Sequence, residues 1–437
     1  MRKILLTLAA MAIIAVSCQK EVSHIELPRE NETEDVTSTR SYNEALQIAE
    51  DALNLLEYKD TRSSKNRVIK RDEGQIVMRP VTRGNETTEE PIIYVFNNEN
   101  NEGFVIVAAD RSQQPIIAVT EEGNYTYGIP TGVEAFDEYI NNTIEVMSYI
   151  PTLPPVIDIP NPNPSVYTDY IDIHEEVEPL LSTKWGQGGI YGQFASNNLA
   201  GCTITAIGQV MAYHQHPHYI TITHDGSNQN LHLDWVEILK HKSGLEENDS
   251  TCLNSTHTTI GHFLREIGYR CGANYHSTGT GLFLRDTQPL LSLWGYNQGT
   301  TRDISSVWLI FDTIKNNLNN DKPICITGYD PDNDNDGHTW VIDGYRYTSV
   351  GYVEYSLNPD YNRNDPLSGP EYIVTSSNIQ TTGLLHYNWG WNGTCDGWFN
   401  LNCYDMDNAE EFDRSYGNSS QYNFDYELSV LYNVYPL

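Results

Sequence analysis

Basic residues are scarce in this chain of 437 residues, which carries 26 Lys and Arg against 59 Asp and Glu. The formal net charge at pH 7 is −33. A surface this acidic repels phosphate backbones and offers them no broad basic face, which argues against a nucleic-acid-binding protein. Hydrophobic residues make up 39% of the chain, an ordinary share for a globular protein, so the composition also argues against wholesale disorder.

Long apolar runs and solenoid-type repeats are absent after the first eighteen residues. Those eighteen residues are different, because Arg2 and Lys3 precede an apolar run over 4–16 of the length typical of a secretory signal. The following Ala-Val-Ser-Cys resembles a bacterial lipobox, in which the cysteine sulfur receives a diacylglycerol. We expect residues 1–17 to be a lipoprotein signal peptide and Cys18 to carry the lipid. An ordinary signal peptide followed by a chance cysteine is the alternative.

A polar, acidic tether over 18–40 is predicted to lead into a small α+β domain over 41–150. Ser41 and Glu44 are spaced as a capping box, and apolar residues recur at helical spacing after them. Further elements are predicted from apolar runs, with strands at 92–96, 104–108 and 115–119 and a helix over 133–150.

A proline-rich stretch, PTLPPVIDIPNPNPS, follows this domain. Proline fixes its own backbone torsion and restricts the residue before it, so we expect an extended, exposed segment that proteases can reach. The sequence therefore predicts a linker with the maturation site over 151–176, and a second domain over 177–437.

A cysteine, a histidine and an asparagine of the second domain stand in contexts typical of nucleophilic catalysis. Cys202 begins a segment with helical apolar spacing, so its thiol is expected at a helix N-terminus, where the dipole stabilises a thiolate. His338 opens the strand-like run GHTWVIDGY, and Asn388 lies in HYNWGWNGTCDGWF. Each residue alone is more ordinary as a buried thiol or a hydrogen-bonded side chain. Together they supply the nucleophile, base and orienting group of acyl transfer.

These segments resemble the streptopain family of cysteine peptidases, which has a papain-like fold. The resemblance covers most of 41–437 and rests on an inhibitory pro-domain followed, in the family's order, by WGQ, AGC, GHTWVIDGY and NWGWNG. It implies an α+β fold in which helices pack on one side of a largely antiparallel sheet, with the site in the cleft between them. The plant-type motif around the catalytic cysteine is absent.

The resemblance implies roles for five residues. Cys202 matches the nucleophile, and His338 matches the general base and acid. Gln187 matches the oxyanion-hole glutamine, Asn388 the residue that orients the imidazole, and Trp389 the indole that shields the His–Asn bond. The family further implies cleavage of internal bonds in protein or peptide substrates, with a preference for an apolar side chain two positions upstream of the cut.

The family also implies that residues 41–150 inhibit the enzyme until they are removed. Because the lipid is expected at Cys18, a cut within 151–176 would activate the peptidase and release it from the membrane in one event. We therefore expect a lipid-anchored precursor in a bacterial cell envelope. Two alternatives stay open: a transglutaminase-type acyltransferase that uses the same three residues, and a catalytically silent surface lipoprotein.

This mechanism needs no cofactor, but one acidic segment raises the alternative of calcium. Asp332, Asp334 and Asp336 read D-x-D-x-D-G, and Asp343 stands where a calcium loop commonly has Glu. However, the residues from Thr339 onward have strand character, and Asn/Asp runs more often form solvated loops. We predict no metal here, with calcium at these aspartates as the alternative.

The other metal-binding residue types are predicted to be structural. The alternating histidines after the Cys202 segment lack matching distant ligands, so we expect them at the surface: His214, His216 and His218. Cys325 lies in an apolar run and is predicted to be buried. Disulfides are permissible outside the cytoplasm, but the remaining cysteines allow no pairing to be predicted.

Overall fold

The structure, a computed structural model, describes residues 39–56, 67–83, 86–111, 113–149, 167–224, 227–241, 254–277, 279–329, 337–359, 361, 372–401 and 427–437. The predicted signal peptide, Cys18, residues 151–166 and the aspartates at 332, 334 and 336 lie outside these ranges. Within the described residues, no helix has the length and apolar character needed to cross a membrane.

The N-terminal domain contains the elements that its apolar runs predict. Its helices and strands are α1 (Tyr42–Ala52), β1 (Gln75–Arg83), β2 (Glu86–Asn97), β3 (Phe104–Ala108), β4 (Ile116–Thr120) and α2 (Glu134–Tyr149). The predicted capping box is present, because the Ser41 hydroxyl accepts the Glu44 N–H and the Glu44 carboxylate accepts the Ser41 N–H. Strand β1 adds an element that the sequence analysis did not predict.

The two helices of this domain lie on opposite faces of its sheet. Ala45 and Ala49 of α1 pack with Phe96 and Val105, whereas Phe136 of α2 packs in the other cluster with Phe104 and Val95. Successive side chains of a strand point to opposite faces, so the strands are buried on both sides and read as continuous apolar runs.

The second domain begins with β5 and ends with β15. Its helices are α3 (Cys202–His214), α4 (Trp235–Ile238), α5 (Asn254–Cys271), α6 (Gln288–Leu293) and α7 (Phe311–Leu318). Its strands are β5 (Tyr167–Val177), β6 (Tyr219–His224), β7 (Ser227–His232), β8 (Asn274–Tyr275), β9 (Thr280–Gly281), β10 (Thr300–Ile304), β11 (Ile324–Tyr329), β12 (Gly337–Leu357), β13 (Tyr372–Asn388), β14 (Gly397–Asn400) and β15 (Glu427–Tyr432).

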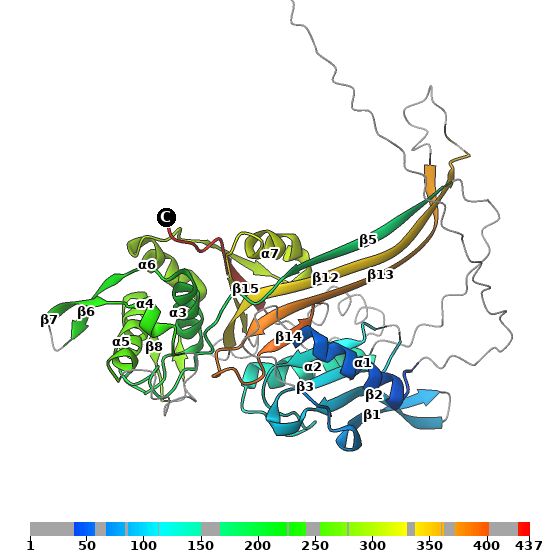
Figure 1. Cartoon of the computed structure of the whole chain (residues 1–437), viewed down its shortest axis with the longest axis horizontal. Coiled ribbons are helices and arrows are strands. Elements are labelled where there is room, and N and C mark those ends of the chain that lie inside the picture. The colour runs from blue at the N-terminus through cyan, green and yellow to red at the C-terminus, as the bar shows by residue number, and fades with distance from the viewer. Residues whose placement is uncertain are drawn as a thin grey trace, which may run out of the picture. The chain divides into compact units, whose positions relative to one another are not determined.

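One antiparallel sheet runs through both domains (Figure 1). The strand order is β1-β2-β3-β4-β14-β13-β12-β11-β15-β10, with β5 paired to β12 off this path. The two domains join where β4 pairs with β14, with Val119 opposite Trp398. The N-terminal domain is therefore docked on the second domain by strand addition, a long-range pairing with no local sequence signal.

Helices cover both faces of the second domain's sheet, which differs from the expected one-sided packing. Ile207 of α3 shares a core cluster with Val341, whereas Ile314 of α7 shares the opposite cluster with Trp340 and Ile342. The physical reason is that β12 is buried on both faces from Trp340 to Tyr345, so each face needs a cover.

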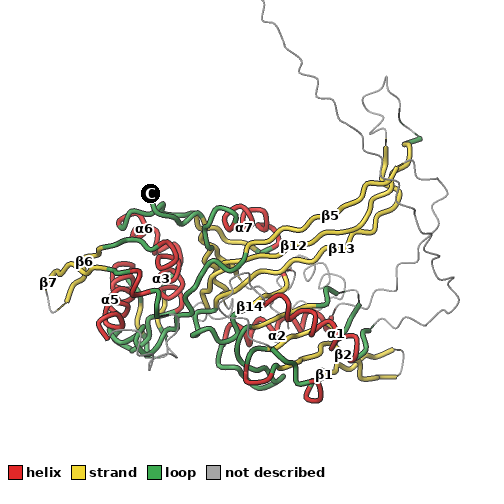
Figure 2. The backbone as a smooth tube through the Cα atoms, viewed as in Figure 1, coloured by secondary structure: helices red, strands yellow, loops and turns green. Residues whose placement is uncertain are grey.

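The end of the predicted linker is part of this sheet. Strand β5 pairs antiparallel with β12 along its whole length, from Tyr167 opposite Tyr355 to Val177 opposite Tyr345. Figure 2 shows β5, β12 and β13 as three long strands side by side. Residues 167–176, which we expected to be linker, are instead a strand paired with β12 of the second domain.

Candidate active site

Cys202 is the first residue of α3, as its sequence context predicts. The preceding Gly201 has a φ of 99°, a conformation that side chains strongly disfavour, and a Cβ there would lie 2.9 Å from the Cβ of Thr280. Glycine therefore allows the sharp entry that leaves Cys202 at the helix N-terminus, where the dipole favours a thiolate.

The Cys202 thiol and the His338 imidazole act on each other although 136 residues separate them in the sequence. Burial opposes ionisation of the thiol, but the hydrogen bond and charge of His338, with the backbone and hydroxyl of Thr339, lower the pKa of Cys202 to about 7. Burial likewise disfavours the imidazolium, yet the contacts with Cys202 and Trp389 raise the pKa of His338. The pair therefore favours a thiolate beside an imidazolium.

The other side of the His338 ring is held by a main-chain carbonyl. His338 Nε2 donates to the carbonyl oxygen of Trp389 at 2.8 Å, which leaves Nδ1 for the thiol. The Trp389 indole is fully buried, with its ring centroid 6.5 Å from that of His338. The Trp389 carbonyl therefore holds one side of the imidazole ring, and the Trp389 indole lies beside it.

Asn388, which the resemblance paired with His338, makes other contacts in this structure. Its side-chain amide donates to the Thr183 carbonyl at 2.8 Å, and its side-chain oxygen accepts from Gln209 Nε2 at 2.9 Å. The reason is strand geometry: Asn388 pairs with Val341, three residues after His338, and so faces the α3 side of the sheet. In this structure the acceptor that His338 contacts is the Trp389 carbonyl, and Asn388 contacts Thr183 and Gln209.

Gln209 is a site-supporting residue that the sequence analysis missed. It lies on α3, is fully buried, and accepts the Trp185 N–H at 2.9 Å while it donates to Asn388. It thus ties the WGQ segment and the end of β13 to the helix that carries Cys202. A glutamine between the apolar residues Ile207 and Val210 was the available signal.

Gln187 lies in a segment that is fixed to the approach to Cys202. Its carbonyl oxygen accepts the N–H of Ala200 at 2.8 Å, and its side chain is partly exposed. This contact brings the WGQ segment beside the residues that lead into α3, which is where an oxyanion donor is needed.

A row of buried hydroxyl groups braces the start of α3 against the sheet. Thr203 Oγ1 donates to the Leu282 carbonyl at 2.7 Å and lies 2.8 Å from Thr339 Oγ1, which is 2.7 Å from Thr327 Oγ1. The row fixes the residues next to both members of the Cys202–His338 pair.

The N-terminal domain covers the His338 side of the site through α2. A cavity beside the imidazole has a volume of only about 10 Å³ and is lined by Ala135, Glu138, Tyr139 and Asn142 of α2 with Gly328, His338 and Trp340. This space cannot admit a substrate side chain. The charge of Glu138 also contributes to raising the pKa of His338.

A buried charge cluster joins the two domains at the β4–β14 contact. Glu121 lies 2.7 Å from the Lys184 ammonium and 3.5 Å from His386 Nε2, while His386 Nδ1 lies 2.6 Å from Asp343. Burial opposes charge on both groups, but these contacts lower the pKa of Glu121 and raise that of His386 to about 10. We call Lys184 and His386 the cationic socket.

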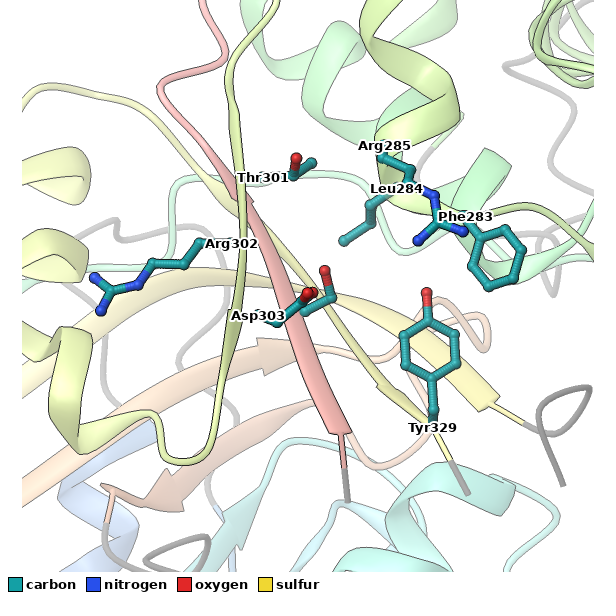
Figure 3. Close-up of a pocket in the computed structure, with 8 residues that line it drawn as sticks. Phe283, Leu284, Arg285, Thr301, Arg302, Asp303 and Tyr329 are labelled. Atoms are coloured by element: carbon teal, nitrogen blue, oxygen red, sulfur yellow. The ribbon is translucent and has the colours of Figure 1, made fainter. Parts of the chain in front are cut away.

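An open pocket of about 110 Å³ flanks the site on the second domain (Figure 3). It is lined by Phe283, Leu284, Arg285, Thr301, Arg302, Asp303, Tyr329 and Ser429. The Arg285 guanidinium lies 4.4 Å from the centre of the Phe283 ring. Leu282, which accepts from Thr203, precedes this pocket in sequence, so the pocket lies next to the start of α3.

The remaining candidate ligands have structural contacts. His214 and His216 direct ring nitrogens at the carbonyl oxygens of Val434 and Trp294, and Asp343 accepts from Leu181 N–H besides contacting His386. Among the described residues, no group of three or more His, Cys, Asp or Glu is arranged to hold a metal ion. Cys325 is buried, as predicted. The described cysteines all have free thiols: Cys202, Cys271, Cys325 and Cys395.

Comparison with known proteins identifies this arrangement. The family profile described as Peptidase C10 family matches residues 185–399, which contain Cys202, His338 and Trp389. This chain belongs to the peptidase C10 family. A second profile, described as Spi protease inhibitor, matches residues 33–144. The C10 match ends at β14, the strand on which the inhibitor-like domain is docked.

Curated relatives of this C10 chain are distant in sequence. Streptopain of Streptococcus pyogenes is 25% identical over 339 residues, covering 71% of this chain and 73% of streptopain. The thiol protease/hemagglutinin PrtT of Porphyromonas gingivalis is 22% identical over 349 residues, covering 72% of this chain and 34% of PrtT.

Two solved structures from Prevotella intermedia also match. A prointerpain A fragment is 18% identical with a TM-score of 0.49, covering 83% of this chain and 100% of that chain. Active interpain A is 19% identical with a TM-score of 0.37, covering 60% and 95%. The predicted streptopain-family membership and papain-like α+β fold with a pro-domain are confirmed. The protein is a cysteine endopeptidase made as a zymogen.

Proposed function

We propose that the C10 peptidase cleaves proteins through a Cys202 thiolate and a His338 imidazolium. The observation that carries this proposal is that the two side chains interact at the N-terminus of α3, where each shifts the pKa of the other towards the charged pair. Cys202 Sγ attacks the scissile carbonyl, the C–N bond breaks, and His338 gives its proton to the leaving amine. Water, deprotonated by His338, then hydrolyses the thioester and restores the thiol.

The oxyanion and the imidazole are proposed to be stabilised by different parts of the site. The Cys202 N–H, at the helix N-terminus, and the Gln187 side chain would donate to the developing negative oxygen. The Trp389 carbonyl would hold His338 in the ring orientation and tautomer that the transfer needs. Asn388 would not contact His338 itself but would fix the end of β13 through its hydrogen bonds with Thr183 and Gln209.

The decisive experiment compares Cys202→Ala with a matched cysteine variant, Cys271→Ala. Cys271 is a partly exposed free thiol on α5, and burial raises its pKa to about 12, so it is a poor nucleophile. We expect casein hydrolysis to vanish in Cys202→Ala and to persist in Cys271→Ala. Casein cleavage by a folded Cys202→Ala protein would rule out the proposal. A fluorescent amine added to the assay tests for acyl transfer, and we expect no incorporation.

We further propose that the precursor is lipid-anchored at Cys18 and that a cut within 151–176 both activates and releases the peptidase. The sequence Ala-Val-Ser-Cys supports the anchor, and the narrow cavity under α2 supports the need for removal. In detergent phase separation of bacterial lysates, the precursor should enter the detergent phase and Cys18→Ala should not. Ser17→Ala is the matched control. Processed, active enzyme retained in the membrane fraction would contradict the release step.

A further inference from the structure

We propose that Asp396 is a positioning residue for His338 and acts through the main chain of Trp389. The inference rests on the proposed roles of Cys202 and His338. The sequence resemblance assigns no role to Asp396. Its side chain bonds the main chain of Trp389 and not Cys202 or His338.

Two short hydrogen bonds connect Asp396 to His338 through one residue. Asp396 Oδ1 accepts the Trp389 N–H at 2.8 Å, and the Trp389 carbonyl accepts His338 Nε2–H at 2.8 Å. The N–H and the carbonyl belong to successive peptide groups, so the two bonds together fix the backbone of Trp389. The Trp389 indole is fixed as well, because its Nε1–H donates to the Cys395 carbonyl at 3.1 Å.

The carboxylate of Asp396 is held where a charge is costly. The residue is 1% exposed, and burial raises the pKa of its carboxyl group to about 7 despite the Lys184 charge and the Trp389 N–H. A buried carboxylate kept beside a catalytic loop indicates a task that a neutral residue would not perform as well. A bond to a carboxylate is stronger than one to a neutral acceptor, and its charge also favours a cation nearby.

The same residue contacts the inhibitor-like domain. The Asp396 carbonyl oxygen accepts the Glu121 N–H at 2.8 Å, and the charged groups that act on its carboxyl are Lys184, Glu121 and His386. The Lys184 ammonium donates to Glu121 at 2.7 Å, and its charge also acts on the Asp396 carboxyl group. Departure of the pro-domain therefore removes a competing anion and leaves the Lys184 charge to Asp396.

The test uses Asp396→Asn, which keeps an oxygen acceptor but removes the charge, and Asp396→Ala, which removes both. Asp343→Asn is the matched control, because Asp343 is an equally buried carboxylate whose partners are His386 and Leu181. In the full-length chain, the rate of Cys202 alkylation by iodoacetamide is followed against pH by peptide mass spectrometry. Casein hydrolysis is measured after processing by a trace of wild-type enzyme.

Loss of the Asp396 carboxylate should make the His338 imidazolium less stable, and this should raise the pKa of the Cys202 thiol. We expect the alkylation profile of Asp396→Asn to shift to higher pH by about half a unit, and Asp396→Ala to lose at least about tenfold in kcat with little change in KM. Asp343→Asn should keep the wild-type profile even where it lowers stability.

Two outcomes separate this inference from the proposed function. A wild-type alkylation profile in folded Asp396→Asn, with Cys202→Ala inactive, would overturn the positioning role alone. If Asp396→Ala does not fold, the isosteric Asn variant still decides. Activity in Cys202→Ala would instead overturn the proposed function on which the inference rests.

Discussion

The carboxylate of Glu121 in the pro-domain lies 2.7 Å from the ammonium group of Lys184 in the peptidase domain. The contact is largely buried, since the side chains are 10% and 28% exposed, so solvent screens it little. It sits at the end of β4, next to the β4–β14 pairing that joins the domains. We therefore expect latency to depend on this charge pair as well as on α2, the helix that covers His338.

Glu121→Gln should weaken the docking of the pro-domain, so that the precursor becomes active sooner. The change leaves Lys184 and His386 buried without their shared anion, and breaking a buried charge pair costs several kcal/mol. We expect activity to appear about tenfold faster or more when purified precursor is incubated with casein. Glu122→Gln is the matched control, because Glu122 contacts Lys184 at 3.2 Å and is 36% exposed. Equal lag times for the two variants would argue against the cationic socket.

The free energy of unfolding of the precursor should depend on pH because His386 titrates. The folded pKa of His386 is raised to about 10, above its ordinary value of 6.5, by Asp343 and Glu121 acting against burial. Its contribution is therefore complete below pH 6.5 and is lost as the pH rises towards 10. Urea midpoints measured from pH 6 to 10 should fall more steeply in wild type than in His386→Gln. The difference between the curves isolates His386, because Cys202 and Asp396 titrate in both proteins.

Alkylation of Cys202 should report its ionisation directly. In the wild-type precursor, the rate of reaction with iodoacetamide should be half-maximal near pH 7, since the pKa of Cys202 is lowered to about 7. In His338→Ala the stabilising hydrogen bond and charge are gone while burial remains, so the midpoint should move above 9, the ordinary value for the thiol. Cys271, whose pKa is raised to about 12, serves as the slow internal reference. An unchanged midpoint in His338→Ala would show that the pair is not coupled.

Gln209→Ala should destabilise the fold by about 2–4 kcal/mol, because it leaves the Trp185 N–H and the Asn388 amide buried without their partner. Denaturant unfolding measures this loss. Gln229→Ala, at an exposed position on β7, should change stability by less than about 0.5 kcal/mol. Comparable losses in the two variants would mean that the network around Gln209 contributes little.

Local patterns in the sequence predicted much of this structure. The capping box at Ser41, the hairpin of β2 and β3, the helix α2 and the helical start at Cys202 all follow from spacing within about twenty residues. The proximity of Cys202 and His338 could be inferred only from the family resemblance, because no local rule brings together residues that are 136 apart in the sequence.

The parts that sequence reasoning missed are those carried by the main chain or by distant pairing. The Trp389 carbonyl accepts the hydrogen bond from His338, and a carbonyl group is present in every residue, so composition gives no sign of this contact. Asn388 was the natural side-chain candidate, but the alternation of β13 turns it towards Gln209. The pairing of β4 with β14 and the pair Glu121–Lys184 join residues too far apart in sequence for any motif to mark.

Strand β5 is expected to set the N-terminus of the processed enzyme. Proteases bind substrates as extended chains, so a segment that is already hydrogen-bonded in a sheet must first dissociate from its partner strand before it can be cut. Every residue from Tyr167 to Val177 has a partner in β12. Whichever bond upstream of Tyr167 is cut first, removal of further residues should stop at β5. Molecules that are cut at different places should therefore end with the same N-terminus.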